Sequence, residues 1–527
     1  MRTKTTLLVA ASVIVAVALV ATAVLAASGG SSSSSASGSA AAPSAATATS
    51  QPAANEGATG RAAAVPRGAT TISLGTPVGR PIPAGFAGLS IEIRTLENYV
   101  GTNPKALNPV FVQLVRNLGP QPILRFGGET TDFSWWPIPG MSRPIGVRYA
   151  ITKNWLALTK ALAEETNARL ILGINLEVNS GKVAGAEAGA MVSGIGKQWI
   201  DGFELGNEPE LYGGLPWFVT HGVAYYGRQH SYDWSDYLHD FSTISKSLPG
   251  SVALAGPSIG SDNWSPILGQ FLQSQPRVRV ATLHRYPTKK CIPSQQVTIG
   301  QLLSGASSLG LAASVAPYAG IAHGHGVPLR IDEMNSVSCG GELGVSNTFS
   351  TALWAVDALF AMARAGINGV NIHTTPKSFN QLFNFQQVKG KWQADIHPEY
   401  YGLMMFAQAA PGGARMLKVA GAPGGTLSIW ATKAPNGLVR VVLINKATSG
   451  ARTVAVRATS KASATLERLQ ARNVSAASGV TLGGRALGST TGSLVGTPRE
   501  DGVPAVSGRY VVKVPAASAA TLTLPAP

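Results

Sequence analysis

Short apolar segments alternate with longer helical patterns through the middle of the chain. From residue 83 to residue 373, eight segments that predict strands are separated by stretches rich in alanine and leucine that predict helices. Eight βα units over about 300 residues match the count and length of a (β/α)8 barrel, an α/β fold. The predicted strands cover 85–92, 122–126, 170–178, 200–205, 252–255, 280–286, 329–333 and 369–373. The predicted helices include 109–118, 153–166, 234–248 and 348–365.

The pattern changes after Tyr401. Short alternating segments, separated by Gly, Asn, Pro and Ser, predict an antiparallel β-sandwich without helices. These segments cover 425–431, 437–444, 453–456, 510–514 and 519–524. We therefore expect a catalytic barrel at 83–404 and a C-terminal β-sandwich domain at 405–527, with a strand from 67–82 joining the sandwich.

The N-terminus predicts export from the cytoplasm. Arg2 and Lys4 precede an apolar segment, 7–27, which ends in small residues as a secretory signal does. The apolar segment is long for a signal, so an uncleaved membrane anchor within 1–27 is the alternative. Residues 28–66 are almost all Ser, Ala, Gly, Thr and Pro and predict a flexible linker. We expect a secreted protein, or one tethered to the cell envelope through its N-terminus.

Polar side chains lie where the predicted strands end. Barrel enzymes carry their chemistry at this end of the strands, and a purely structural barrel has no reason to collect polar groups there. A doubly wound sheet is the alternative fold, but it usually has a glycine-rich phosphate turn after its first strand, which this sequence lacks. The polar residues are Glu92, Arg125, Asn175, Glu177, Asn207, Glu208, His284, Tyr286, Glu333, Asn335 and His373.

Two glutamates are the candidate catalytic pair. Glu208 follows the fourth predicted strand and Glu333 ends the seventh, so the barrel can bring their carboxylates together across its mouth. Glycoside cleavage with retention needs an acid and a nucleophile about 5–5.5 Å apart, with different proton affinities. Arg125 and Tyr286 are positioned to keep Glu333 ionised, and Asn207 can hydrogen-bond a sugar 2-hydroxyl.

Four motifs accompany these residues. They are Arg-Phe-Gly-Gly-Glu-Thr-Thr-Asp-Phe at 125–133, Glu-Leu-Gly-Asn-Glu-Pro at 204–209, His-Arg-Tyr at 284–286 and Glu-Met-Asn-Ser at 333–336. Over residues 70–527 the chain thereby resembles glycoside hydrolase family 79 of clan A, the heparanase and β-glucuronidase family. The resemblance implies a retaining exo-β-glycosidase of β-glucuronidase type, acting on a carbohydrate or glycoside through a covalent glycosyl-enzyme. It also implies that Glu208 is the acid/base and Glu333 the nucleophile, with no cofactor or metal.

The resemblance further implies a set of sugar contacts. It implies contacts from Glu92, Thr130, Asp132, Asn207 and Tyr286. The predicted substrate-binding set also includes Arg125, Asn175, Ser338, Gly340 and His373. The aromatic residues Trp135, Trp136 and Trp264 are candidate sugar-stacking platforms, whereas Trp354 has the spacing of a core residue in a helix.

The loop after the nucleophile departs from the family pattern. Members that cleave uronates use a tyrosine five residues after the nucleophile and glycine amides just beyond it. Here the fifth residue is Ser338, followed by Cys339, Gly340 and Gly341. The glycine amides can still receive an anion, but the tyrosine hydroxyl is missing. A β-glucosidase that accepts a neutral sugar or a disaccharide is therefore the alternative.

The two cysteines predict a disulfide. Cys339 lies in the loop after the nucleophile and Cys291 follows the sixth predicted strand, so neighbouring loops can bring them together. An exported chain folds where disulfides persist. We expect a Cys291–Cys339 bond that braces the sugar-binding site.

Three further features of the sequence are also found in proteins of other functions. The sequence has 42 Lys and Arg against 26 Asp and Glu, but the basic residues are scattered singly and no nucleic-acid motif is present. Gly-Pro-Ser-Ile-Gly at 256–260 fits the serine hydrolase pattern around Ser258, but a loop rather than a helix follows it, which favours a turn at the barrel mouth. His323 and His325 lack acidic or cysteine partners for a metal. A carbohydrate-binding protein without catalysis is a remote alternative.

Overall fold

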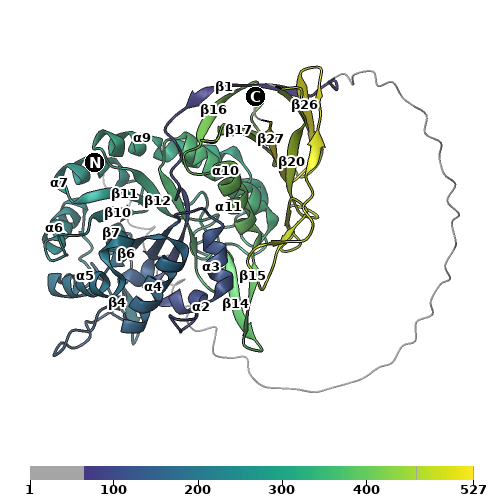
Figure 1. Ribbon diagram of the computed structural model, residues 1–527. Helices are drawn as coiled ribbons and strands as arrows, with labels where there is room; N and C mark the ends of the chain where they lie inside the picture. The colour runs from purple at the N-terminus through teal and green to yellow at the C-terminus, as the bar shows by residue number, and fades with distance from the viewer. Residues whose placement is uncertain (1–64, 459, 526–527) are drawn as a thin grey trace, which may run out of the picture. The chain divides into compact units, whose positions relative to one another are not determined.

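Eight parallel strands close into a barrel in chain order, which confirms the predicted fold class (Figure 1). These strands are almost entirely buried, since helices cover the outside of the barrel and side chains fill its interior. The barrel strands are β2 (Ala87–Glu92), β3 (Ile123–Gly127), β6 (Arg169–Ile174), β7 (Ile200–Leu205), β10 (Leu254–Ile259), β11 (Val278–His284), β12 (Leu329–Met334) and β13 (Gly369–Thr374).

Helices connect these strands, and side-chain caps fix where several of them begin. Asn108 accepts hydrogen bonds from two backbone amides at the start of the helix that opens with Pro109. Asp233 forms a capping box with Asp236. The helices are α2 (Leu96–Val100), α3 (Pro109–Arg116), α4 (Lys153–Thr166), α5 (Gly181–Ile195), α6 (Trp234–Ser245), α7 (Leu268–Ser274), α8 (Ile299–Leu302), α9 (Leu311–Gly324), α10 (Phe349–Arg364) and α11 (Pro398–Ala409).

A second, mostly antiparallel sheet forms the C-terminal domain. Its strand β1 comes from the segment ahead of the barrel and pairs antiparallel with β16 and parallel with β19. Apolar side chains from both halves of the sheet share one core. The strands are β1 (Thr70–Val78), β16 (Arg415–Ala420), β17 (Leu427–Lys433), β18 (Val439–Asn445), β19 (Arg452–Arg457), β20 (Ala464–Gln470), β21 (Thr481–Leu482), β24 (Asp501–Val503), β25 (Ala505–Val506), β26 (Arg509–Val514) and β27 (Ser518–Leu524).

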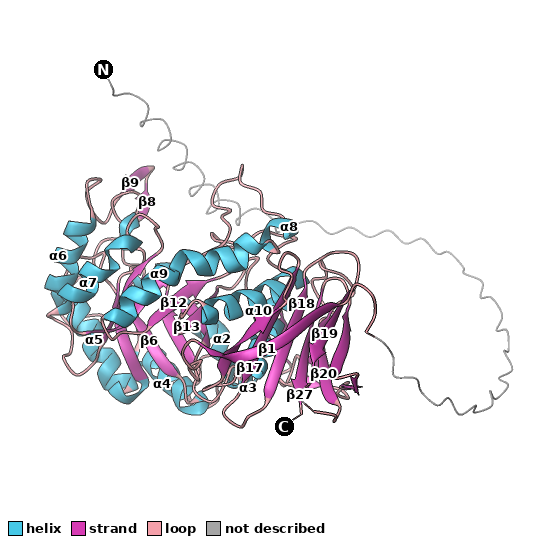
Figure 2. Ribbon diagram, turned by 90° about the horizontal axis from the view of Figure 1, so that it is seen from above, coloured by secondary structure: helices cyan, strands magenta, loops and turns pink. Residues whose placement is uncertain are grey.

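Four small two-stranded sheets lie outside these two assemblies. The β8–β9 hairpin projects from the body beyond the neighbouring helices (Figure 2). The pairs are β4 (Ser134–Trp135) with β5 (Tyr149–Ala150), β8 (Phe218–Thr220) with β9 (Val223–Tyr225), β14 (Phe383–Val388) with β15 (Lys391–Ile396), and β22 (Ala486–Leu487) with β23 (Leu494–Val495).

A buried polar cluster joins the barrel to the C-terminal sheet. Asp357, on α10, accepts hydrogen bonds from Lys446 Nζ at 2.6 Å and from Trp430 Nε1 at 2.8 Å, both in the sheet domain. Ser308 Oγ donates to the same carboxylate at 2.7 Å. Because all of these groups are buried, the two domains share a satisfied charge pair as well as apolar contacts.

Two strand boundaries differ from the sequence predictions. β10 begins at Leu254 and continues through Pro257 and Ser258 to Ile259, where a turn at the barrel mouth was expected. β6 ends at Ile174, so Asn175 lies in the loop that follows rather than within the strand. The expected domain boundary at residue 404 falls inside α11.

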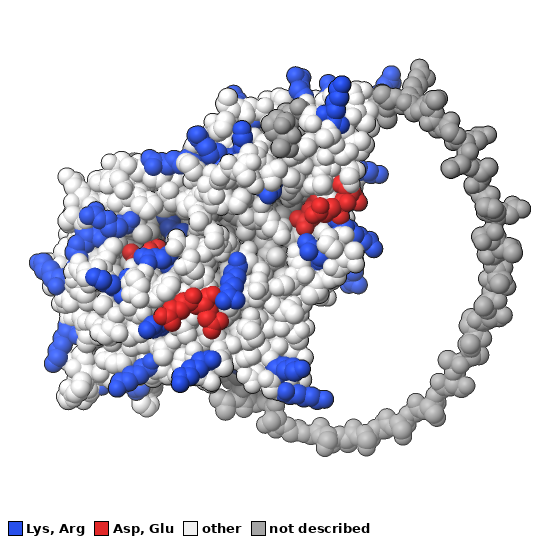
Figure 3. Space-filling view, in the orientation of Figure 1, with Lys and Arg blue, Asp and Glu red and all other residues white. Residues whose placement is uncertain are grey.

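This computed structural model describes residues 65–458 and 460–525. The predicted signal or anchor, 1–27, and nearly all of the predicted linker lie outside these ranges. Among the described helices, none combines the length and apolar character needed to cross a bilayer. Lys and Arg side chains are scattered over the face shown in Figure 3, with few acidic groups between them.

Candidate active site

The buried guanidinium of Arg125, on β3, is the hub of the barrel mouth. Its Nε donates to Glu204 Oε2 at 2.6 Å, and its Nη1 donates to Glu333 Oε2 at 2.7 Å. Its Nη2 donates to Asn207 Oδ1 at 2.9 Å. Asp332 Oδ2 lies 3.3 Å from Nε. One cation therefore faces three carboxylates from strands β7 and β12, and these acids raise its pKa well above the ordinary value, against the opposing effect of burial.

Glu333 is held as a carboxylate. Besides the bond from Arg125, its Oε1 accepts a hydrogen bond from Tyr286 Oη at 2.9 Å. His373 Nδ1 lies 3.8 Å from its Oε2. Burial alone would raise the pKa of Glu333, but the interactions with His373 and His284 lower it. The charge and hydrogen bond of Arg125 add to this effect, so the pKa lies well below its usual range.

Glu208 is held in a different environment. Its backbone is left-handed, with φ 47° and ψ 56°, a conformation that is uncommon for a residue other than glycine. Its amide donates to Ser258 O at 2.9 Å, and His284 Nδ1 lies 3.1 Å from its Oε1. The side chain is 25% exposed, against 11% for Glu333. Glu208 is therefore the more accessible of the two carboxylates, while Glu333 lies deeper and contacts Arg125.

The two candidate catalytic carboxylates lie close together. One carboxylate oxygen of Glu208, one of Glu333 and one ring nitrogen of His284 all lie within 4.8 Å of one another. His284 Nδ1 lies between the two acids, 3.1 Å from Glu208 and 4.0 Å from Glu333. This spacing is in the range of retaining glycosidases, whereas inverting enzymes leave about 6.5–9.5 Å for a water.

Glu92, Thr130 and His373 meet beside Glu333. Glu92 accepts hydrogen bonds from the amide of Thr130 at 2.8 Å and from the Thr130 hydroxyl. His373 Nε2 lies 3.6 Å from Glu92 Oε1. Gly128 has a φ of +72°, and a Cβ there would lie 2.5 Å from Glu92 Oε1, so only glycine leaves room for this carboxylate. Three predicted substrate-binding residues thus line one side of the site.

Asp132 and Asn175 serve the protein backbone. Asp132 Oδ1 accepts from the amides of Leu176 and Glu177, and its Oδ2 accepts from Asn207 N at 3.0 Å and Tyr212 Oη at 2.7 Å. The Asn175 amide donates twice to carbonyls, and its oxygen accepts from Val178 N. Both side chains are almost completely buried. The structure therefore gives both predicted sugar contacts a positioning role, with Asp132 holding the loop that carries Asn207.

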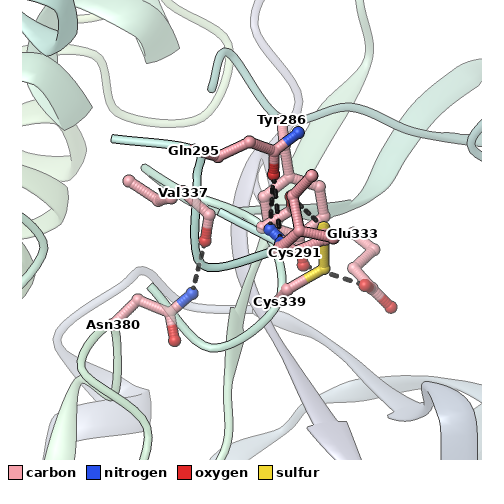
Figure 4. Close-up of a disulfide and its surroundings, with 9 residues drawn as sticks. Tyr286, Cys291, Gln295, Glu333, Val337, Cys339 and Asn380 are labelled. Atoms are coloured by element: carbon pink, nitrogen blue, oxygen red, sulfur yellow. Dashed lines mark hydrogen bonds between the residues drawn. A yellow bond between two sulfur atoms is a disulfide. The ribbon is translucent and has the colours of Figure 1, made fainter. Parts of the chain in front are cut away.

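The loop after Glu333 is closed by the predicted disulfide (Figure 4). Cys291 and Cys339 are bonded, with their Cα atoms 5.1 Å apart, which confirms the prediction. Ser338 Oγ lies 3.4 Å from Cys291 Sγ, and the Ser338 amide donates to Thr288 O. Cys339 and the two glycines after it have positive φ, at 56°, 86° and 88°. The loop is thus a tight left-handed turn beside Tyr286 and Glu333.

Sequence reasoning did not identify the buried acids Glu204 and Asp332. Both contact Arg125, and both are fully buried. Glu204 lies within an apolar strand, at a position where a charge is costly unless it is paired, and this was the available signal. Burial raises the pKa of Asp332 well above its usual value, while Arg125 lowers that of Glu204 against the effect of burial.

The structure gives little support to a serine hydrolase site or to a metal site at His323 and His325. Ser258 is fully buried, so it is not accessible to a bound ester, and the next α-helix, α7, begins only at Leu268. Two groups of ligand-type side chains, Glu204–His284–Asp332 and Glu208–His284–Glu333, occur among the described residues. Arg125 already supplies a positive charge to both groups. His323 Nε2 bonds Asn368 Oδ1 at 2.8 Å rather than facing a cluster of acids.

The candidate stacking residues differ in burial. Trp135 is 4% exposed and packs in a small core with Val147 and Val183. Trp136 and Trp264 are partly buried against the main core. Trp354 is buried in α10 and donates to Ser307 O, as its helical spacing predicts. Trp136 and Trp264 therefore remain the partly exposed candidates for stacking on a sugar.

Comparison with known proteins agrees with this geometry. Residues 429–521 match the model of the glycosyl hydrolase family 79 C-terminal beta domain. A β-glucuronidase from Neurospora crassa is 21% identical over 332 residues, and one from Aspergillus niger is 24% identical over 376 residues. These alignments cover 56% and 63% of this chain, and 58% and 66% of the relatives' own lengths.

A solved structure shares the whole described fold. The 4-O-α-L-rhamnosyl-β-D-glucuronidase from Fusarium oxysporum 12S, solved as a Rha-GlcA complex, superposes with a TM-score of 0.67 at 18% identity. The match covers 86% of this chain and 100% of that one. The arabinofuranosidase of family GH51 from Xanthomonas axonopodis pv. citri matches with a TM-score of 0.58 at 14% identity. Taken with the motifs at the strand ends, these findings support an assignment to glycoside hydrolase family 79.

Proposed function

We propose that this protein is a retaining, exo-acting β-glycosidase of β-glucuronidase type. The observation that carries the proposal is the close approach of Glu208 and Glu333, within 4.8 Å, in unlike environments. Retention requires such a pair, one member ionised and one able to carry a proton. The named relatives, which are β-glucuronidases, support the same class of reaction.

The reaction would proceed in two displacements. In the first, a carboxylate oxygen of Glu333 attacks the anomeric carbon while Glu208 gives its proton to the glycosidic oxygen, and the aglycone leaves as an alcohol. In the second, Glu208, now a carboxylate, takes a proton from water, and the hydroxide attacks the anomeric carbon. The bond to Glu333 breaks, Glu208 is again protonated, and the sugar leaves with its original configuration.

The surroundings of each acid suit its step. Arg125 and Tyr286 donate to Glu333, so the nucleophile is ionised without a separate base. The Asn207 side chain is fixed by Arg125 and lies next to Glu208 in sequence, where its amide group can meet the sugar 2-hydroxyl. Glu92 and His373 offer further polar contacts for sugar hydroxyls.

The residue at position 338 separates two candidate sugars. A glucuronide would be bound through the backbone amide of Gly340, in a turn of residues with positive φ, because the Gly341 amide already donates to Ser338 O at 3.4 Å. A neutral β-glucoside is the second candidate, because Ser338 replaces the tyrosine that uronate-cleaving relatives use. Ser338 Oγ faces the disulfide sulfur of Cys291 at 3.4 Å rather than an open subsite. We propose that the protein acts outside the cytoplasm, since its disulfide persists in oxidising compartments.

A panel of aryl β-glycosides tests the assignment. Turnover of the glucuronide, the glucoside or neither separates the candidates, including a binding protein without catalysis. Glu333→Ala should abolish turnover of every substrate. Glu208→Ala should spare the first step for a good leaving group and slow the second. Glu164→Ala, an exposed glutamate on α4, is the matched control and should keep full activity. An equal, mild loss in both catalytic variants would contradict the assignment.

A further inference from the structure

The segment Gly256–Gly260 carries a motif that the proposed reaction does not use. It matches the pattern of a serine nucleophile, yet Ser258 is fully buried and has a left-handed backbone with φ 59°. A buried serine in a strained conformation, at the end of a barrel strand, needs another explanation. Several polar contacts of this segment lead toward Glu208 or its neighbours.

The first contact is through the backbone. Ser258 O accepts the amide hydrogen of Glu208 at 2.9 Å. This bond ties β10 to the turn after β7 at Glu208, a non-glycine residue with a left-handed backbone. The amides of Gly260 and Ser261 both donate to Glu210 Oε1 at 2.6 Å, which fixes the same turn from its other side.

The second contact is through the Ser258 hydroxyl. Arg125 Nη2 lies 3.3 Å from Ser258 Oγ and can only donate to it. The hydroxyl hydrogen is then free to point at His284 Nε2, which lies 3.1 Å away. A neutral imidazole in this arrangement carries its proton on Nδ1, and a charged one carries protons on both nitrogens. In either state Nδ1 donates to Glu208 Oε1.

The third feature is that Gly260 has no side chain beside Glu208. A Cβ on Gly260 would lie 2.5 Å from Glu208 Oε1 and 3.2 Å from Glu208 Cδ. Gly260 does not have a positive φ, so its backbone would accept alanine. The atom that an alanine methyl would displace is the end of a flexible side chain, so the fold survives while the carboxyl moves.

We propose that Gly256–Gly260, together with His284, positions the acid/base glutamate, so that Glu208 Oε1 is occupied by His284 and its proton is carried on Oε2. This inference rests on the proposed function. Among the described residues no donor bonds Oε2, which leaves that oxygen to face the glycosidic bond. Ser258 and Gly260 are positioning residues, since neither needs to touch the substrate.

Two aryl glycosides of the preferred sugar test the proposal through kcat/KM, which reports the first chemical step. A dinitrophenyl glycoside needs no acid because its leaving group is already stable, whereas a phenyl glycoside does. A misplaced catalytic group can cost 10²-fold, so Gly260→Ala should lower kcat/KM about 100-fold for the phenyl glycoside and less than about threefold for the dinitrophenyl one. Ser258→Ala should show the same selectivity with a loss of about tenfold.

The controls separate this inference from the proposed function. Gly189→Ala, on α5, adds a methyl that meets no atom within 4 Å and should leave both substrates unaffected. Glu208→Ala should itself lower kcat/KM mainly for the phenyl substrate. If it does, and Gly260→Ala lowers kcat/KM equally for both substrates or for neither, the positioning role is wrong and the acid assignment stands. If Glu208→Ala lowers kcat/KM equally for both substrates, the acid assignment fails and this inference fails with it.

Discussion

At the residue scale, the site is organised around a single cation. Arg125 is fully buried and contacts carboxylates from two different strands, so its loss would leave several negative charges without a partner. Breaking a buried ion pair by removing one member is far more costly than never having it. The same guanidinium helps to keep Glu333 ionised, so stability and the proposed activity depend on one side chain.

Arg125→Met should therefore affect both properties. We expect the free energy of unfolding to fall by about 3–5 kcal/mol, measured by urea denaturation. Loss of the cation raises the pKa of Glu333, so the acidic limb of the kcat/KM profile should move to higher pH. Arg169→Met is the control: its ion pair with Asp201 is partly exposed, and its loss should cost less than about 1 kcal/mol. An equal fall in the free energy of unfolding of the two variants would contradict the role of Arg125 as the hub of the site.

Glu177 lies in the loop after β6, and its carboxyl group is close enough to Asp132 to be affected by its charge. Burial, and then the charge of Asp132, raise the pKa of Glu177 from its usual 4.5 to about 9, against the opposing charge of Arg228. The folded state thus favours the protonated acid, so this contribution to stability is complete below about pH 4.5 and is lost as the pH rises toward 9. Thermal unfolding should show stability falling from pH 5 to pH 8 more steeply in the native protein than in Glu177→Gln. Parallel slopes would show that Glu177 does not carry the effect.

At the element scale, the sequence pattern predicted all eight barrel strands and the meeting of Glu208 and Glu333 at the barrel mouth. It failed where local composition disagreed with tertiary context. Gly256, Pro257 and Ser258 indicated a turn, yet these residues continue β10, because the strand there pairs with β11 on one side. Asp132 lies in a motif typical of sugar binding, but a sequence does not show that backbone amides will occupy its oxygens.

Also at this scale, the disulfide links the loop after β11 to the loop after β12. The two cysteines are 48 residues apart, and closing a loop of this length is worth up to about 4 kcal/mol in the chain-entropy account. The double variant Cys291→Ser, Cys339→Ser should lower the free energy of unfolding by about 2–4 kcal/mol. The native protein unfolded in a reducing buffer should match it. Unchanged stability in both would mean that the loops are fixed by their hydrogen bonds alone.

At the scale of the whole molecule, two domains share a buried boundary. β1 precedes the barrel in the chain but pairs within the C-terminal sheet, so the barrel lies between two segments of its partner domain. Asp357 and Lys446 connect the domains, with side chains that are 0% and 2% exposed. Such an arrangement predicts that the barrel and the sheet unfold together.

Lys446→Met tests this connection. It leaves Asp357 buried with only neutral donors, and we expect the free energy of unfolding to fall by about 3–5 kcal/mol. Lys433→Met, at an exposed position of the same sheet, should change it by less than about 0.5 kcal/mol. Two separate unfolding transitions in the native protein would instead show that the domains are independent.

The central claim is that Glu333 attacks the sugar while Glu208 serves as acid and base. The most direct test is to incubate the protein with a dinitrophenyl 2-deoxy-2-fluoro-β-glycoside of the preferred sugar, which slows the second step, and to locate the adduct by peptide mass spectrometry. We expect one fluoroglycosyl group per protein, attached to Glu333. An adduct on any other residue, or hydrolysis with inversion and no adduct, would contradict it.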